Sequence, residues 1–394
     1  MIRVGFILAN SASWTGGLIY LRNLIGAVME LPERKIEPVL IIAPNTPDAD
    51  IAGFGAIELI RTSLVAGRLR YKIARKASEK ILRRNILLEN FLKRHRIDVL
   101  SHSGYLGMNS SVPAIAWLPD FQHVRMPEFF QQEEVAARDK GYSATARFAQ
   151  AILLSSADAQ KDLAQFAPEA LANSRILRFM AGMVKPDDKR GQNFLVETYG
   201  IDRPYFYLPN QFWRHKNHAL VIDALGMLAK SGTAPLVVCS GKTEDRRNPE
   251  YFEALMHHAH EVGARPYFKV LGLVPYEHLS VLSRHSVAII NPSHFEGWST
   301  TVEEAKSMGK AILLSDIPVH REQAPERAIY VAKDDPMAMA EAMLATLAAW
   351  SPGAEAEANA TATAGLSARR IEFGQTYQTI VLEVAKHLDR DQIL

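Results

Sequence analysis

The chain has 394 residues, which is too long for one hydrophobic core and predicts two domains. Hydrophobic residues make up 48% and charged residues 22%, a balance that excludes a wholly disordered chain, and the net charge of +2 argues neither for nor against nucleic acid. No apolar run approaches the length of a membrane span, and the apolar N-terminal run is too short for a signal peptide, so we expect a cytoplasmic protein.

Short apolar runs alternate with helical patterns along the first half of the chain, which predicts a parallel α/β sheet. The strands expected there cover residues 4–8, 39–42, 99–100, 115–118 and 152–154. The first strand leads into a loop with Gly16 and Gly17, where the missing Cβ lets a backbone approach a ligand. A tight turn with no ligand explains the glycines equally well, because the three-glycine dinucleotide fingerprint is absent.

A basic segment follows between Arg61 and Arg96, with twelve Lys or Arg residues against two acidic ones. Its apolar residues recur at helical spacing, and a basic amphipathic helix is typical of a surface that meets anionic lipid. An ordinary core-facing helix with a charged outer face has the same pattern. Nucleic acid is disfavoured because aromatic residues are not interleaved with the cations.

Polar residues also follow the strand expected at residues 115–118. Asp120 and His123 offer proton chemistry among aromatic residues, which favours a role on one lip of a cleft. A capped turn with a satisfied histidine is the alternative. His102, after the strand at residues 99–100, is a weaker candidate of the same kind.

A second series of apolar runs predicts a second, similar sheet. Its strands are expected at residues 205–208, 236–239, 268–271, 287–290, 311–314 and 329–331. The polar segment 185–192 separates the two series and places the domain boundary near residue 185. Ligands of open α/β sheets bind beyond the carboxyl ends of the strands, so we expect the site in a cleft between the domains. Residues 354–364 are expected to form a flexible connection before a final helix at 373–388.

Two cations, Arg214 and Lys216, lie in the loop after the first strand of the second series. Fixed cations at this position stabilise the negative charge that develops on a departing nucleoside diphosphate. A solvated loop is the alternative. His215 and His218 lack the carboxylate or cysteine companions of a metal site, so we expect no metal there.

Glu296 and Glu304 stand with seven residues between them after the strand expected at 287–290. The pattern predicts a turn and then a helix at residues 300–308 that is stopped by Gly309. A carboxylate pair also fits a glycoside hydrolase, but both glutamates are expected near one helix start and not on either side of a scissile bond.

The predicted helix start carries Ser299, Thr300 and Thr301, all good N-caps, and a capping box to Glu303 or Glu304 is expected. Free N–H groups at a helix start attract phosphate, and carboxylates at its rim accept hydrogen bonds from sugar hydroxyls. The sequence therefore favours a phosphorylated sugar as the ligand.

These motifs together resemble the retaining glycosyltransferases of family 4, also called glycosyl transferases group 1. The likeness is strongest between residues 205 and 331, where the segments 271–279, 286–293 and 311–322 and the two glutamates follow the family's order and spacing. In the first domain it rests on the Gly16–Gly17 pair, Asp120 to His123 and the segment 153–157.

The resemblance implies the GT-B architecture, an α/β fold with two Rossmann-like domains facing each other across a cleft. Residues 1–185 would form the acceptor-binding domain and residues 186–370 the domain that binds a nucleotide sugar. The C-terminal helix, residues 371–394, would return to pack on the first domain.

The resemblance also implies roles in the second domain. Glu304 would hold the ribose hydroxyls, Glu296 would lie close to the transferred sugar, and Lys216 would lie beside the leaving phosphates. The amides from Gly297 to Thr300 would face the sugar and the diphosphate. The segment around Leu273 would flank the base.

Two positions depart from the family pattern. The family's arginine stands about five residues before the lysine, where this chain has Gln211, and Arg214 is present but shifted. Trp298 replaces a common Phe, which we expect to change only the local shape.

In the first domain, His123 is the candidate to orient or deprotonate the acceptor hydroxyl.

The implied reaction moves a hexose from a nucleotide diphosphate sugar to a hydroxyl of a glycan or lipid-linked glycan, with retention and without a metal or other cofactor. Segments 120–123 and 210–213 are similar to surface-polysaccharide mannosyltransferases, which favours GDP-mannose as donor and polysaccharide or lipopolysaccharide synthesis. The basic segment favours a peripheral place on the inner face of the cell membrane. The alternatives are a GT-B sugar phosphorylase or nucleotide-sugar epimerase, and a catalytically silent sugar-nucleotide-binding protein or membrane scaffold.

Overall fold

The computed structural model describes residues 1–8, 15–67, 71, 73, 78, 81–107, 110–182 and 191–391. The chain divides into two compact units. Unit 1 comprises Met1–Arg125, Gln132–Met180 and Ser367–Leu394, and unit 2 comprises Met126–Gln131 and Ala181–Leu366. The boundary expected at residue 185 lies outside the described residues.

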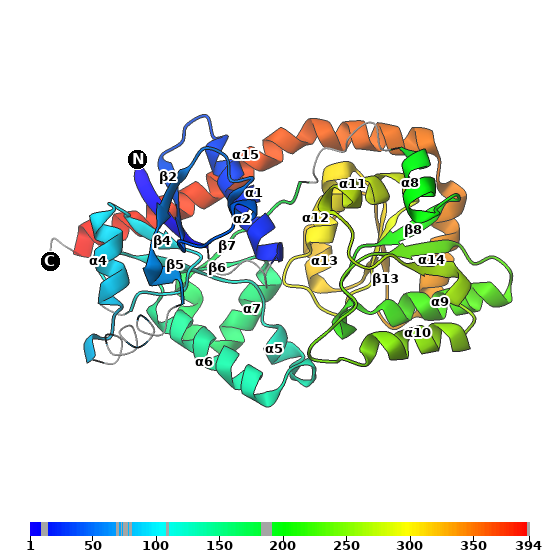
Figure 1. Cartoon of the computed structure of the whole chain (residues 1–394), viewed down its shortest axis with the longest axis horizontal. Coiled ribbons are helices and arrows are strands. Elements are labelled where there is room, and N and C mark those ends of the chain that lie inside the picture. The colour runs from blue at the N-terminus through cyan, green and yellow to red at the C-terminus, as the bar shows by residue number, and fades with distance from the viewer. Residues whose placement is uncertain are drawn as a thin grey trace. The chain divides into compact units, whose positions relative to one another are not determined.

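Unit 1 contains, within its described residues, a seven-stranded parallel sheet of order β3-β2-β1-β4-β5-β6-β7 (Figure 1). Its strands are β1 (Ile2–Ile7), β2 (Ile36–Ile42), β3 (Glu58–Arg61), β4 (Val99–Ser101), β5 (Ala114–Leu118), β6 (Ala151–Leu154) and β7 (Ser174–Ile176). Its helices include α1 (Thr15–Met29), α2 (Asp48–Ile51), α4 (Ile86–Arg94), α5 (Gln122–Arg125), α6 (Gln132–Phe148) and α7 (Ala157–Phe166).

The five strands expected in the first series are confirmed, and the sequence missed the two edge strands. β3 exposes three of its four residues, and β7 has only three residues, two of them polar. Neither therefore shows the continuous apolar run that marks a strand buried on both faces. The core lies where the run is continuous, as in β2, six of whose seven residues are buried.

Unit 2 contains, in the part that the structure describes, a six-stranded parallel sheet of order β10-β9-β8-β11-β12-β13. Its strands are β8 (Tyr205–Leu208), β9 (Leu236–Cys239), β10 (Phe268–Val270), β11 (Ile289–Asn291), β12 (Ile312–Ser315) and β13 (Ala328–Val331). Its helices include α8 (Gln192–Tyr199), α9 (His218–Lys230), α10 (Tyr251–Glu261), α11 (Tyr276–His285), α12 (Thr300–Met308), α13 (Pro318–Gln323) and α14 (Pro336–Ala349). All six expected strands are confirmed.

The order of the strands reverses between β8 and β11, which are neighbours in the sheet although two strands separate them in the chain. Such a switch point leaves a crevice at the carboxyl ends of the two strands, where open α/β sheets bind ligands. Helix α12 follows β11 and ends with Gly309 in the left-handed conformation, as the sequence predicted. The sheet therefore presents the loop after β8 and the start of α12 at one edge.

The flexible connection expected at residues 354–364 is wrong, because α15 is one continuous helix, Pro352–Asp391 (Figure 1). Alanine is the strongest helix former, so the small residues favour a helix over a loop. Within unit 2, Glu355 accepts hydrogen bonds from Lys310 Nζ at 2.7 Å and Arg327 Nη2 at 2.6 Å, which fixes the start of this helix. Within unit 1, Tyr377 and Val381 of the same helix are fully buried.

Among the described residues, no helix combines the length and the apolar character that crossing a membrane requires.

Candidate functional site

The loop after β8 and the turn after β11 bring Lys216 and Glu296 together. Lys216 Nζ donates a hydrogen bond to Glu296 Oε1 at 2.6 Å, and the Ser293 hydroxyl donates to the same oxygen at 2.7 Å. The two charged side chains are only 14% and 9% exposed. The expected cation and the first expected glutamate thus form one buried ion pair at the switch point of the sheet.

The Lys216 ammonium decides the charge of Glu296. Burial alone opposes ionisation of the carboxyl, but the nearby cation and its hydrogen bond outweigh burial and lower the pKa of Glu296 to about 2. Both hydrogen bonds reach Oε1, and among the described residues no donor reaches Oε2. Glu296 therefore offers one charged, unoccupied acceptor.

Glu304 lies about one turn along α12 and is half-buried. No described residue forms a hydrogen bond or an ion pair with its carboxyl group. Burial raises the pKa of Glu304 to about 8, so this carboxyl is largely protonated at neutral pH in the unliganded protein. The two glutamates on either side of the α12 start consequently carry different charges.

The start of α12 is capped by Ser299, whose side chain accepts from the Val302 amide at 3.4 Å. The expected capping boxes are wrong, because the Glu303 carboxyl accepts from Gln323 Nε2 instead, at 3.0 Å. Gln323 Oε1 also accepts a hydrogen bond from the Ser299 amide, at 3.1 Å. In the described structure, the amides of Thr300 and Thr301 remain without an acceptor and are available to an anion.

The other unit 2 residues that the sequence placed near a nucleotide-sugar donor differ in their exposure and contacts. Leu273 is 70% exposed and Trp298 is 8% exposed. The guanidinium carbon of Arg214 lies 5.3 Å from the centre of the Phe129 ring. Gln211 accepts a hydrogen bond from the Lys242 amide at 2.6 Å. Arg214 is therefore held on an aromatic ring and makes no hydrogen bond to Glu296.

The sequence reasoning missed Ser293, Asn291 and Gln323 as parts of this site. Asn291 donates to Ser299 Oγ at 2.7 Å, so it holds the residue that caps α12. Ser293 and Asn291 follow the last apolar residues of β11, and polar residues at a strand's carboxyl end were the available signal. Gln323 offered no such signal, because it reaches the site from the end of α13.

In unit 1, Gly16 and Gly17 lie in the first turn of α1, and the loop before it lies outside the described residues. Asp120 accepts a hydrogen bond from the Gln122 amide at 2.9 Å and so fixes the start of α5. His123 has no exposed surface, and burial lowers its pKa. Its Nε2 lies 3.3 Å from Asp139 Oδ1 without hydrogen-bond geometry.

His102 lies at the carboxyl end of β4 in a network that the sequence did not predict. Tyr20 of α1 and Ser101 each form a hydrogen bond to a ring nitrogen of His102 at 2.8 Å. Tyr377 of α15 donates to Ser101 at 2.8 Å. This network ties α15 to the carboxyl end of β4, the central strand of the unit 1 sheet.

No group of three or more His, Cys, Asp or Glu side chains in the described part of the chain is arranged to hold a metal ion.

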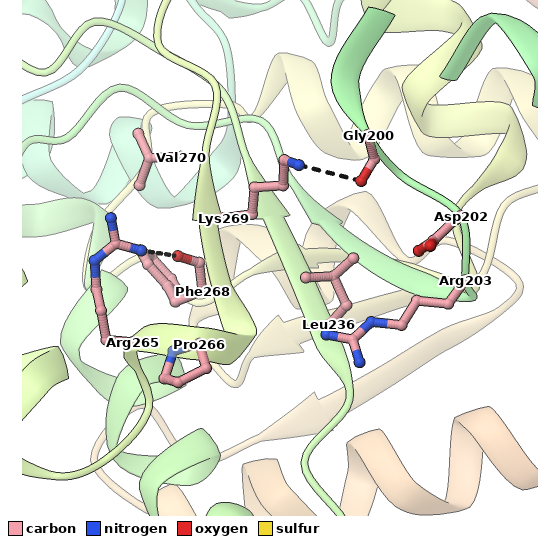
Figure 2. A pocket seen from close by; sticks show the side chains of 9 residues that line it. All are labelled: Gly200, Asp202, Arg203, Leu236, Arg265, Pro266, Phe268, Lys269 and Val270. Carbon is pink, nitrogen blue, oxygen red and sulfur yellow. Dashed lines mark hydrogen bonds between the residues drawn. The ribbon is translucent and has the colours of Figure 1, made fainter. Parts of the chain in front are cut away.

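A separate hollow of about 650 Å³ lies at the opposite, amino-terminal end of β8, β9 and β10 (Figure 2). Its cations include Lys269, which donates to the Gly200 carbonyl at 3.2 Å, and Arg265, which donates to the Phe268 carbonyl at 3.1 Å (Figure 2). These contacts hold the loops around the hollow. The hollow is therefore distinct from the site at the carboxyl ends of the strands.

Comparison with known proteins agrees with this layout. Residues 196–363 match the family model "Glycosyl transferases group 1". No curated protein sequence matches the chain. The segment that carries the family match contains Lys216, Glu296 and Glu304.

Several solved structures share the fold over almost the whole chain. A glycosyltransferase from Rickettsia africae is 11% identical with a TM-score of 0.67, and the match covers 98% of each chain. Anabaena Alr3699/HepE, solved with UDP and glucose, is 14% identical with a TM-score of 0.65, covering 98% of this chain and 100% of that one. WaaG, a glycosyltransferase involved in lipopolysaccharide biosynthesis, is 16% identical with a TM-score of 0.56, covering 98% and 99%.

The two parallel-sheet, Rossmann-like units are thus those of the GT-B fold, which the sequence predicted. The family match and the shared fold support a transferase enzyme with a glycosyltransferase group 1 domain.

Proposed function

We propose that the chain is a retaining glycosyltransferase whose unit 2 binds a nucleotide diphosphate sugar. One observation carries the proposal: the buried Lys216–Glu296 pair, 2.6 Å apart, lies beside a helix start with unoccupied amides. A cation and free N–H groups suit a diphosphate, and an unoccupied carboxylate oxygen suits a sugar hydroxyl.

Each part of the donor has a partner of matching chemistry. The diphosphate is bound by the amides of Gly297, Thr300 and Thr301 and by Lys216. Glu304 accepts hydrogen bonds from the ribose hydroxyls. The base lies against Leu273, and the transferred sugar donates a hydrogen bond to Glu296 Oε2.

In the reaction, the bond between the anomeric carbon and the diphosphate oxygen breaks, and negative charge develops on the leaving phosphate. An ammonium has three N–H donors and Glu296 uses one, so Lys216 has two left for that charge. The acceptor hydroxyl attacks from the face that the diphosphate leaves, and its proton passes to the leaving phosphate oxygen. The anomeric configuration is retained. Because Lys216 and the helix amides balance the charge, the proposed transfer needs no metal.

The acceptor is a hydroxyl of a glycan or lipid-linked glycan, bound through unit 1. The role of WaaG in lipopolysaccharide biosynthesis supports this class. A hexose is transferred, and GDP-mannose is the first donor to test, beside UDP-glucose because Alr3699/HepE has been solved with UDP-glucose. His123 orients the acceptor only if its fully buried ring becomes accessible.

Peripheral attachment to the membrane is part of the proposal. Several cations of the basic segment lie outside the described residues. Within the described part, Ile73, Ile81 and Leu82 are 59%, 77% and 49% exposed. Exposed apolar side chains beside cations suit an anionic bilayer. Co-sedimentation with vesicles that contain anionic lipid, but not with neutral vesicles, is the expected result.

Product analysis by mass spectrometry tests the function. The protein is incubated with GDP-mannose or UDP-glucose, with and without a lipid-linked glycan acceptor and with and without EDTA. Glycosylated acceptor and free nucleoside diphosphate, formed only when acceptor is present and unaffected by EDTA, support the proposal. A sugar phosphate formed with inorganic phosphate, or an epimerised donor, would show one of the alternative activities instead.

A further inference from the structure

His320, at the start of α13, is a fully buried histidine that the proposed reaction does not yet use. Its Nδ1 lies 2.9 Å from the Ser315 carbonyl oxygen. A carbonyl oxygen only accepts, so Nδ1 carries the proton. The hydrogen bond therefore determines which tautomer the ring adopts.

With its proton on Nδ1, the neutral ring presents a lone pair at Nε2. Burial lowers the pKa of His320 below its ordinary value, so the ring is neutral at neutral pH. Nε2 is buried, and no described residue donates a hydrogen bond to it. A buried acceptor without a donor is costly, so a hydrogen bond donated to it by a bound molecule would be stabilising.

His320 belongs to the same cluster as the ion pair. Ser315 Oγ donates to the Ser293 carbonyl at 2.5 Å, and the Ser293 hydroxyl donates to Glu296 at 2.7 Å. The charges of Glu296 and Lys216 both act on the imidazole ring, in opposite directions. The cluster thus holds two acceptors to which no described residue donates: Nε2 of His320, which is buried, and Oε2 of Glu296, whose partner oxygen Oε1 takes both hydrogen bonds.

We propose that His320 Nε2 and Glu296 Oε2 accept hydrogen bonds from two hydroxyls of the transferred sugar, so that His320 is a specificity-determining residue for the donor. The proposal rests on the proposed function, because it assumes that the sugar occupies this cluster. It selects sugars in which both hydroxyls are free. A sugar that is deoxygenated or fluorinated at either position has no hydrogen to donate and leaves a buried acceptor without a partner.

The test uses UDP-glucose and GDP-mannose together with analogues in which one sugar hydroxyl at a time is replaced by fluorine. kcat/KM is measured for wild type, His320→Leu, His320→Gln and the control His285→Leu, which removes a half-buried histidine from α11 in the same unit. Fluorine keeps the size of the substituent and removes the donated hydrogen.

We expect wild type to discriminate by about tenfold or more against the analogue that lacks the hydroxyl facing His320. His320→Leu should lose discrimination at that one position and keep it at the others. His320→Gln, whose amide oxygen accepts a hydrogen bond, should recover part of it. His285→Leu should match wild type. If His320→Leu keeps the whole wild-type profile, or weakens every position equally, the inference is wrong.

Binding of free UDP, GDP, dTDP and ADP, measured by calorimetry on the same variants, separates the two proposals. If wild type binds none of the four nucleotides, the proposed function fails. If the variants bind a nucleotide as wild type does and turn over the unmodified donor while the fluorine profile is unchanged, only the role of His320 fails. If His320→Leu does not fold, His320→Gln is compared with wild type instead. A change in discrimination at one sugar position only supports the role of His320, and an unchanged profile contradicts it.

Discussion

Lys216 and Glu296 are 80 positions apart in the chain, yet their charged atoms lie 2.6 Å from each other at the switch point of the unit 2 sheet. This contact gives the two glutamates different states. Glu296 stays ionised because a cation adjoins it, whereas Glu304, without a cation, is largely protonated. The contact with Lys216 therefore keeps one of the two carboxyl groups charged while the other is largely neutral.

Removing the cation should destabilise unit 2. In Lys216→Met, Glu296 is left buried without its partner, and we expect a loss of about 3–5 kcal/mol in the free energy of unfolding, measured with urea. Lys216→Met with Glu296→Gln should recover much of the loss. The control is Lys242→Met, which removes an exposed pair with Glu244 and should cost less than about 1 kcal/mol. If Lys216→Met and Lys242→Met lower the free energy of unfolding equally, the buried ion pair stabilises the protein no more than the exposed one does.

The same pair has a defined pH dependence. The pKa of Glu296 is depressed from its ordinary 4.5 to about 2 in the folded protein, so its contribution is present above about 4.5 and is lost as the pH falls through about 2. Glu304 behaves in the opposite way. Its folded pKa is raised to about 8, so its contribution is complete below about 4.5 and is lost as the pH rises through about 8.

Binding of a nucleoside diphosphate should release a proton from Glu304. The ribose hydroxyls donate to the carboxyl group and stabilise its charged form, which lowers a pKa that is about 8 before binding. Calorimetry at neutral pH in two buffers with different ionisation enthalpies measures the release. In Glu304→Gln the buffer dependence should vanish and affinity should fall. A wild-type enthalpy that is the same in both buffers would remove Glu304 from the ribose site.

Gly309, at the end of α12, packs against Ala358 of α15 and should tolerate no side chain. Its φ is +61°, and an added Cβ would overlap the carbonyl oxygen of Ala358. Gly309→Ala should lower the free energy of unfolding by about 1–3 kcal/mol. Gly353→Ala is the matched control, since no atom lies within 4 Å of its added Cβ and alanine favours the helix. A stable Gly309→Ala variant would mean that the two helices separate easily.

His123 can be tested without disturbing the packing around it. Its ring packs edge-on against Tyr142, with centres 4.7 Å apart, so His123→Phe keeps an aromatic ring and removes both nitrogens. If the histidine orients the acceptor hydroxyl, kcat should fall by about 100-fold while the affinity for the donor stays unchanged. Transfer at the wild-type rate would show that the buried ring only supports the fold.

The sequence predicted those features whose stabilising residues are neighbours in the chain, and it missed those that depend on residues far apart in the chain. Helix α12 was predicted to the residue, because Ser299 and Gly309 are adjacent to it and carry its start and stop. The Gln323 contacts could not be predicted, because they join positions 24 and 20 residues apart through the path of α13. The expectation at residues 354–364 was wrong because the low sequence complexity of this segment does not oppose a helix: its small residues are largely alanine, the strongest helix former.

The central claim, that unit 2 binds a nucleotide diphosphate sugar, is tested most directly by a thermal-shift screen of the whole chain against GDP-, UDP-, dTDP- and ADP-sugars. A ligand that binds only the folded state raises the Tm as its concentration exceeds its Kd. We predict that one nucleotide class raises the Tm of wild type and that Lys216→Met loses this shift relative to its own unliganded Tm. No shift with any of the four classes, while a known nucleotide-sugar enzyme responds in the same plate, would contradict the claim.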